Sequence, residues 1–449
     1  MKIPALLGGP RAFECEVPIS QPTLPHPRAV VPDMERALES KQLTNGSYVR
    51  RFEREVECRL GVSYAIATSS CTSGLLLVLR ALGVKGEVIL PSFTFFATAH
   101  AVIWNGLKPV FADCDPGTLN VDPASVEARL TRKTEAIIGV HIFGNPCPIR
   151  ELEQIAGRNH LHLLFDAAHG LGASYRGAPI GRFGDAEVFS LSPTKTVVAG
   201  EGGIITTRSA RLAEALRAAR DYGNSGDYDP VIVGLNARME EFNAILGSVT
   251  LKALDENIAF RTALAAQYAR GLAGIAGLSL QAIPSDNRSS FKDFGVLVDE
   301  EFFGLSRDEL HETLRAEGIM TKKYFSPPVH RQKAYIQHAP KDPLALVATE
   351  YVSSMVLCLP MFAHMEPSTV SRICEAIRGI QEHAVEIRRI SRKPEALFPR
   401  VGTTVSGAAK NERPPALLPD VGTTLRIAPG GVENEDECRV CTLSDARTE

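Results

Sequence analysis

The stretch FSLSPTKTVVAGEGG, residues 189–203, has a single lysine, Lys195, between a short apolar run and a glycine-rich turn. A second stretch, LHLLFDAAHG, ends an apolar run at Asp166, and His169 follows three residues later. A carboxylate at the end of a buried strand is costly unless a cation or several donors meet it. A lysine amine can attack a carbonyl carbon and form a covalent imine. The two stretches together indicate covalent chemistry at a lysine that lies near a buried carboxylate.

The segment YAIATSSCTSG indicates a phosphate site. Thr72 and Ser73 open an apolar helix directly after a β-like run, and the N-terminus of a helix binds phosphate through free N–H groups and the positive end of its dipole. Ser190 adds a hydroxyl group five residues before Lys195. A lysine, a carboxylate and a phosphate seat match pyridoxal phosphate: the lysine binds its aldehyde, the carboxylate keeps its ring nitrogen protonated, and the helix end binds its phosphate.

The elements that must position these residues alternate between strand and helix patterns from about residue 60 to 207. Runs such as EVILP, EAIIGVHIFG and LHLLFDAA alternate with helix-like segments such as FFATAHAVIWNG and PIRELEQIA. This alternation predicts an α/β fold with a mostly parallel sheet and helices on both of its faces. Ligands of such sheets bind at the carboxyl ends of the strands, which is where Asp166 and Lys195 are predicted.

A second, smaller α/β region is predicted after a long helix that follows RMEEF. Met239, Phe242, Leu246 and Val249 recur at helical spacing in that segment. Beyond it, FKDFGVLVD is typical of a strand and SRDELHETLRAEG of a capped helix. We therefore predict a large domain over residues 1–254, including an N-terminal arm, and a small C-terminal α/β domain over residues 255–384.

The remaining residues, 385–449, are predicted to form a flexible or weakly structured tail. The chain from residue 391 onward is rich in proline and glycine and has one aromatic residue, Phe398. Its CRVC motif, Cys438 to Cys441, has no second ligand pair nearby, so we predict no metal site.

The composition excludes several classes of protein. The formal net charge is −3 and no long run of Lys or Arg occurs, which argues against nucleic-acid binding. The apolar stretch near the N-terminus is too short for a signal peptide, and no other run is long enough to span a membrane. We expect a cytoplasmic protein that binds neither nucleic acid nor membrane.

Many phrases occur in the order found in a known family: ALLGGPRAF, LTNGSYVRRFE, PSFTFFATAHAV, PVFADCDPGTLNVDP, FDAAHGLGASYRG, FSLSPTKTVVAGEGG, GLNARMEEFNAILG and YFSPPVHRQ. From about residue 5 to 384 the chain resembles the DegT/DnrJ/EryC1/StrS family of sugar aminotransferases. The resemblance implies the aspartate aminotransferase-like architecture, fold type I, and pyridoxal 5'-phosphate as cofactor.

The resemblance also implies a role for each matching residue. Lys195 would bind the cofactor covalently and move the proton, Asp166 would pair with the pyridine nitrogen, and His169 would contact the ring hydroxyl or the ring face. The other cofactor-binding residues that it implies are Thr72, Ser73 and Ser190 at the phosphate, Phe95 against the ring, and Asn236, which reaches the phosphate from the neighbouring subunit. Asn236 therefore implies a homodimer with shared active sites. Ser192 stands where many members of the family have histidine.

The implied reaction moves an amino group from glutamate to a nucleotide-linked keto-sugar. Tyr324, Lys323 and His330 in TKKYFSPPVHRQ and Tyr222 in RDYGNSGDY are the candidate substrate-binding residues. The phrases ALLGGPRAF and YFSPPVHRQ favour amination at C4 of a dTDP-4-keto-6-deoxyhexose. Amination at C3 of a keto-sugar or of a cyclitol stays open, because those enzymes share nearly all of these phrases.

Three other classes of protein compete with this interpretation. A nicotinamide enzyme with HGLGASYRG as its dinucleotide loop is disfavoured, because Tyr175 stands at the third glycine position. A related sugar dehydratase is disfavoured because it has histidine where this chain has Lys195. A non-catalytic regulator that binds pyridoxal phosphate stays open.

Overall fold

The computed structural model describes residues 3–342 and 344–391. A seven-stranded sheet forms, in the order β1-β9-β8-β5-β4-β2-β3. All neighbours are parallel except the pairs that contain β9, which runs antiparallel to both β1 and β8. The predicted mostly parallel sheet is therefore confirmed. The strands are β1 (Tyr64–Thr68), β2 (Glu87–Pro91), β3 (Lys108–Ala112), β4 (Thr134–Val140), β5 (His162–Asp166), β8 (Ala186–Ser190) and β9 (Gly203–Thr207).

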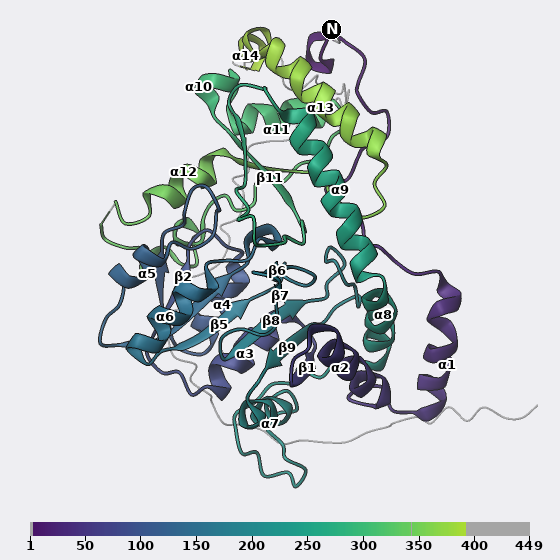
Figure 1. Ribbon diagram of the computed structural model, residues 1–449, viewed down its shortest axis with the longest axis vertical. Coiled ribbons are helices and arrows are strands. Elements are labelled where there is room, and N and C mark those ends of the chain that lie inside the picture. Colours follow the sequence, from purple (N-terminus) through teal and green to yellow (C-terminus); the bar gives the residue numbers. More distant parts are fainter. Residues whose placement is uncertain (1–2, 343, 392–449) are drawn as a thin grey trace, which may run out of the picture. The chain divides into compact units, whose positions relative to one another are not determined.

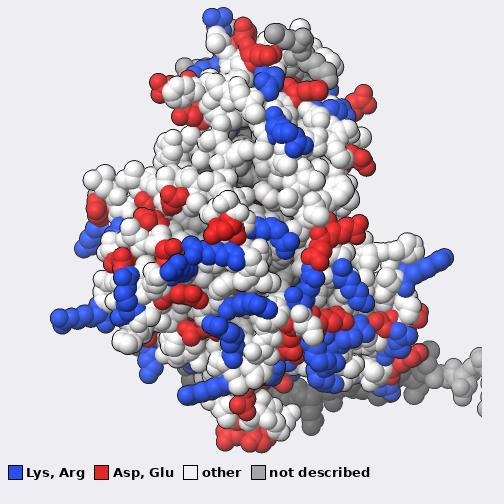
Figure 2. Space-filling model, viewed as in Figure 1, with Lys and Arg blue, Asp and Glu red and all other residues white. Residues whose placement is uncertain are grey.

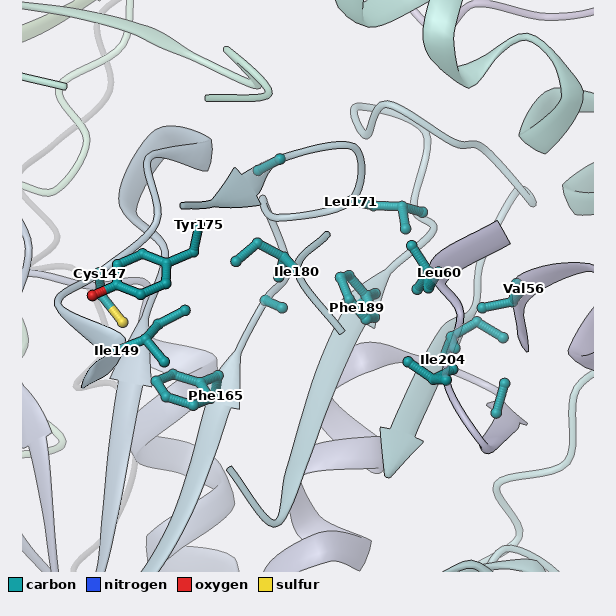
Figure 3. Close-up of a cluster of buried hydrophobic side chains, with 14 of the residues drawn as sticks. Val56, Leu60, Cys147, Ile149, Phe165, Leu171, Tyr175, Ile180, Phe189 and Ile204 are labelled. Carbon is teal, nitrogen blue, oxygen red and sulfur yellow. The ribbon is translucent and has the colours of Figure 1, made fainter. Parts of the chain in front are cut away.

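Helices cover both faces of this sheet, because successive strand residues point to opposite sides and both sides are apolar. Phe165, Phe189 and Ile204, from three neighbouring strands, belong to one buried cluster (Figure 3). Leu164 belongs to the cluster on the other face. The first cluster includes residues of α2 (Ser47–Leu60), α6 (Ile149–Asn159) and α8 (Glu241–Lys252), and the second includes residues of α3 (Cys71–Ala81), α4 (Phe96–Trp104) and α7 (Ala210–Ala219). The remaining elements of this part are α1 (Val31–Ser40), α5 (Pro123–Ala128) and the short hairpin of β6 (Ser174–Tyr175) and β7 (Ala178–Pro179).

The directions of the strands bring the end of β5, the end of β8 and the start of α3 to one edge of the sheet. β5 ends at Asp166 and β8 ends at Ser190, and these two strands are parallel. β1 runs in the same direction as β8, because both are antiparallel to β9, so α3 also begins at this edge. Gly203 pairs with both Thr68 and Ser190, and a Cβ atom there would lie 2.6 Å from the carbonyl carbon of Ser70. Only glycine permits this close approach of β9 to the start of α3.

A second part has its own sheet and its own core. The strands β10 (Leu278–Leu280), β11 (Phe294–Val298) and β12 (Val356–Leu359) form an antiparallel sheet in that order. The helix α9 (Leu254–Leu272) leads from α8 into this part and packs on α13, as Figure 1 shows. As predicted, α11 is capped, by a reciprocal pair formed by Ser306 and Glu309. The other helices are α10 (Glu300–Phe303), α11 (Arg307–Ala316), α12 (Val347–Met355), α13 (Pro367–Glu382) and α14 (Ala384–Ser391).

Three sequence predictions need correction. The helix α8 begins only at Glu241, so Met239 is a core residue that precedes the helix. The N-terminal arm packs on the smaller part: Phe13 and Val17 lie in the core of that part. Their amides donate hydrogen bonds to the carbonyl groups of Glu317 and Gly318. The tail does not begin at 385, because α14 continues to Ser391 and Ile387 is fully buried. The other tail predictions, Cys438 and Cys441 included, lie outside the described residues.

The surface has no dominant charge on the face that Figure 2 shows. Positive and negative side chains are interspersed there, as a net charge of −3 leads one to expect. Within the described residues, no helix combines the length and the apolar character that crossing a membrane requires.

Candidate active site

A cavity of about 270 Å³ lies at the carboxyl edge of the large sheet. Its wall includes the loop after β8, the turn after β5, the start of α3 and residues of the smaller part. Eight of the residues singled out from the sequence line it, namely Thr72, Phe95, Asp166, His169, Ser190, Ser192, Lys195 and Tyr324. Residues more than 200 positions apart thus meet around one space.

Lys195 lies in the loop between β8 and β9. Hydrogen bonds hold this loop: the Lys195 amide donates to the Ser192 carbonyl at 3.0 Å, and the hydroxyl of Thr196 donates to the Leu171 carbonyl at 3.0 Å. Burial and then the nearby charge of Lys292 lower the pKa of Lys195 from 10.5 to about 8, against the opposing charges of Asp293 and Asp166. A large fraction of the amine is therefore neutral near pH 8, as a nucleophile or a general base requires.

Asp166 is almost completely buried at the end of β5. Thr98 Oγ1 donates to its Oδ2 at 2.7 Å, and the Ala168 amide donates to its Oδ1 at 3.1 Å. Burial nevertheless raises the pKa of Asp166, although these donors and the charge of Lys195 partly oppose it. A cationic group bound in the cavity would supply the charge partner that this carboxylate needs.

His169 lies on the turn that follows β5. Burial, followed by the charges of Lys195, Lys292 and His141, lowers the pKa of His169 well below its usual value. The ring is therefore neutral at physiological pH, with one nitrogen that donates and one that accepts a hydrogen bond.

At the start of α3 some residues cap the helix and others face the cavity. Ser70 and Ser73 cap the helix: the Ser73 amide donates to Ser70 Oγ at 3.0 Å, and the Ser70 amide donates to Ser73 Oγ at 3.1 Å. Ser73, predicted at the phosphate, does not line the cavity, whereas Thr72 does. The first two amides of the helix, at Cys71 and Thr72, have no intrahelical acceptor and remain for a ligand. Hydroxyl groups of Ser190, Ser192 and Thr194 line the same cavity.

Two aromatic rings also line the cavity. Phe95 precedes α4, and 44% of its surface is exposed, which is unusual for a large apolar side chain. Burial and the charge of Asp293 raise the pKa of Tyr324 to about 12, so its hydroxyl stays protonated. An exposed ring in the wall of the cavity offers an apolar face to a flat ligand.

His330, predicted as a substrate-binding residue, does not line this cavity. Its ring is buried, Nδ1 is bonded to Ser92 Oγ at 2.7 Å, and Nε2 is bonded to Glu350 Oε1 at 2.8 Å. With both nitrogens bonded, His330 holds its loop against the end of β2 and does not line the cavity.

The other three predicted residues also lie away from this cavity. Lys323 pairs with Asp308 at 2.9 Å. Tyr222 and Asn236 are exposed, and an isolated backbone bridge between Asp221 and Asn236 holds this loop together. Neither Asn236 nor Tyr222 lines the cavity that contains Lys195.

Sequence reasoning missed three side chains that meet at the site. Thr98 binds Asp166 from within an apolar helix, and its only signal was a hydroxyl group in that helix. Lys292 lines the cavity and pairs with Asp293 at 2.8 Å. The signal for this pair was two opposite charges directly before the apolar strand FGVLV.

The residues present fit pyridoxal phosphate. Lys195 supplies an amine of lowered pKa, Asp166 a buried carboxyl group of raised pKa, and Phe95 an exposed ring. The amides and hydroxyl groups at the start of α3 and after β8 supply the donors that a phosphate group needs.

Comparison with known proteins agrees with this fit. Residues 28–378 match the DegT/DnrJ/EryC1/StrS aminotransferase family. The dTDP-4-amino-4,6-dideoxy-D-glucose transaminase of Shigella dysenteriae is 36% identical over 365 residues, which cover 81% of this chain and 98% of that protein. The dTDP-3-amino-3,4,6-trideoxy-alpha-D-glucose transaminase of Streptomyces venezuelae is 35% identical over 346 residues, which cover 76% and 89%.

A solved structure is similar over most of the chain. The crystal structure of DesI in the presence of its TDP-sugar product has a TM-score of 0.82 and 38% sequence identity, and the match covers 86% of this chain and 98% of that one. Both the predicted fold type I architecture and the predicted cofactor are thereby confirmed. The chain belongs to the DegT/DnrJ/EryC1/StrS aminotransferase family and is a pyridoxal-phosphate-dependent aminotransferase.

Proposed function

We propose that this aminotransferase transfers an amino group from glutamate to a nucleotide-linked keto-sugar, at C4 of a dTDP-4-keto-6-deoxyhexose. One observation supports the transfer chemistry: Lys195, whose pKa is lowered, lines the same cavity as the buried Asp166. The sugar class rests on the relatives, because both curated transaminases compared above are named for dTDP-linked amino sugars.

In this proposal the residues that line the cavity have different tasks. Pyridoxal phosphate supplies, when bound, a ring that stabilises negative charge at the substrate carbon. Lys195 would hold the cofactor covalently, and its amine, of lowered pKa, would serve as the base that takes a proton from the substrate carbon. Asp166 keeps a positive charge on the ring nitrogen, and Phe95 packs on the ring face. Thr72 and Ser190 hold the phosphate, and Tyr324 donates a hydrogen bond to the substrate.

The choice of C4 over C3 needs an experiment, because relatives of both kinds have similar identities to this chain. Purified enzyme with bound cofactor and glutamate would be given 4-keto and 3-keto dTDP-6-deoxyhexoses and a keto-cyclitol, and amino products would be measured by mass spectrometry. We expect kcat/KM for the 4-keto sugar to exceed the others by at least about tenfold. Preference for the 3-keto sugar would move the assignment to C3, and preference for the cyclitol would contradict the nucleotide-sugar assignment.

We also propose a homodimer with shared active sites, in which Asn236 binds the phosphate in the partner's cavity. Support comes from the loop that carries it: Tyr228, Val231 and Val233 are 95%, 72% and 70% exposed. Apolar side chains gathered on one exposed loop are typical of a surface that another protein covers.

Mixing two inactive variants tests the shared site. Lys195→Ala and Asn236→Ala protomers would be unfolded, mixed in equal amounts and refolded. Half of the dimers then contain one variant of each kind, and one of their two sites is intact, so about a quarter of wild-type activity is expected to return. The matched control mixes Lys195→Ala with Asp166→Asn, which alter the same half-site and are expected to restore nothing. No recovery in the first mixture would contradict a shared site.

A further inference from the structure

The backbone of residues 289–293, directly before β11, is attached to the part that holds the large sheet. The Ser290 amide donates to the Gly144 carbonyl at 3.2 Å, and the Lys292 amide donates to the Phe143 carbonyl at 3.0 Å. Ser290 Oγ donates to the His169 carbonyl at 2.6 Å. The smaller part of the molecule therefore fixes the main chain of a residue that lines the cavity.

The side chain of Asp293 faces the same histidine. Its carboxylate is 4% exposed, and Oδ1 accepts a hydrogen bond from Lys292 Nζ at 2.8 Å. Among the described residues Oδ2 has no hydrogen-bond partner, and it lies 3.9 Å from His169 Nδ1. A buried carboxylate oxygen without a donor is unfavourable. The separation of 3.9 Å is longer than a hydrogen bond, so a bond between these two groups requires a movement of their side chains.

We infer that Asp293 is a positioning residue that accepts a hydrogen bond from the Nδ1–H group of His169. This bond fixes the neutral ring in one tautomer, with the unprotonated Nε2 turned toward the cavity as an acceptor. Asp293 does not line the cavity, so it acts through His169 and does not touch a ligand itself. The fixed tautomer itself is independent of substrate; only its effect on turnover rests on the proposed contact of His169 with the cofactor.

The surroundings of Asp293 match this role. Lys292 pairs with this buried carboxylate at 2.8 Å and supplies its counter-charge. Arg261 Nη1 donates to the carbonyl groups of Phe291 at 3.1 Å and Lys292 at 3.3 Å, so the backbone before Asp293 is held as well. The charged or titratable groups that act on His169, apart from Asp293, are Lys195, Lys292 and His141. All three disfavour a second proton on the ring, so a neutral ring with one defined N–H group is expected.

The substitution Asp293→Asn is a sharp test, because an amide side chain has one acceptor end and one donor end. Lys292 can only donate, so the amide oxygen of the new side chain is expected to stay on Lys292 and to turn the NH₂ group toward His169. A donor that faces Nδ1 favours the opposite tautomer, with the proton on Nε2. The substitution should therefore reverse the tautomer of His169 while it keeps the size of the side chain.

The tautomer is measured by ¹⁵N NMR on the full-length holoenzyme with labelled histidine. The chain has 11 histidines, and His169→Gln identifies the signal of interest. We expect the Nδ1–H tautomer in the wild type, the Nε2–H tautomer in Asp293→Asn, and a fall in kcat on the order of tenfold in that variant with little change in KM for glutamate. The control Asp286→Asn removes an exposed charge that pairs with Arg176 at 3.3 Å and should leave the tautomer and kcat unchanged.

Two results would overturn the inference: an Nε2–H tautomer in the wild type, or an unchanged tautomer in folded Asp293→Asn. If that variant does not fold, the wild-type tautomer decides alone. An enzyme that fails to aminate the proposed sugar but shows both tautomers as expected would refute the proposed substrate and leave the role of Asp293 intact.

Discussion

Replacing Lys195 by alanine is expected to lower glutamate-dependent turnover by at least about 10⁴-fold, because one amine both holds the cofactor and moves the proton. The measurement is steady-state amination of a keto-sugar, together with borohydride reduction and peptide mass spectrometry. The wild type should retain the mass of the cofactor on the Lys195 peptide, and the variant should not. Lys85→Ala, at an exposed lysine, is the matched control and should behave as wild type. Turnover that survives in Lys195→Ala would refute the assigned base.

The same lysine predicts a pH dependence. Its pKa in the folded protein is about 8, so the fraction of neutral amine grows as the pH rises through 8. Cofactor-free protein should therefore bind pyridoxal phosphate covalently at a rate that rises with an apparent pKa near 8. A midpoint near that of an ordinary lysine would contradict the burial of this amine.

The lowered pKa of Lys195 also costs stability below pH 8, and this cost disappears as the pH rises from about 8 toward 10.5. Lys195→Met should accordingly raise the melting temperature of the cofactor-free protein at neutral pH.

Replacing Asp166 by asparagine is expected to separate activity from stability. Turnover should fall by about 10²- to 10³-fold, because a neutral amide cannot hold a positive charge on the ring nitrogen. The pKa of Asp166 is raised in the folded protein, so its charge costs stability, and that cost appears as the pH rises above the usual value of a carboxyl group. At neutral pH the cofactor-free variant should therefore melt at the same temperature as the wild type or higher. Thermal melts followed by circular dichroism and steady-state rates measure the two effects.

Asp185, directly before β8, provides the matched control. Burial acts to raise the pKa of Asp185, but bonds from His162 and the Leu163 amide outweigh it and hold the pKa below its usual value. Its charge therefore stabilises the folded chain above that range, so Asp185→Asn should lower the melting temperature and leave kcat unchanged. An Asp166→Asn enzyme with full turnover would contradict the role proposed for Asp166.

The candidate site was partly predictable from the sequence, because several of its members end strands. Asp166, Ser190 and Lys195 follow apolar runs in a pattern that implies a parallel sheet, and parallel strands bring their carboxyl ends to one edge. The start of α3 follows from the same rule, since β1 ends there too. The sequence did not predict that Thr72 lines the cavity while Ser73 does not, because this depends on which hydroxyl group caps the helix.

Other members depended on contacts that no local pattern reports. His330 stands in a motif near Tyr324, but Ser92 and Glu350 bond both of its nitrogens, so its ring lies away from the cavity. In the sequence, Lys292 and Asp293 look like ordinary charged residues before a strand. In the structure they are buried near His169, which precedes them by more than 120 residues in the chain. The N-terminal arm precedes the large sheet in sequence but packs on the smaller core, which its apolar residues Phe13 and Val17 help to build.

The sequence by itself determined the alternation of strands and helices, the edge at which ligands bind, and the chemical identity of Lys195 and Asp166, because these depend on local hydrophobic pattern and on residue type. The tertiary structure decided how those groups are tuned. The lowered pKa of Lys195, the raised pKa of Asp166 and the closeness of Asp293 to His169 come from burial and from charges on distant segments. Burial and charge act through space, and a chain reveals which of its charges are close together only after it has folded.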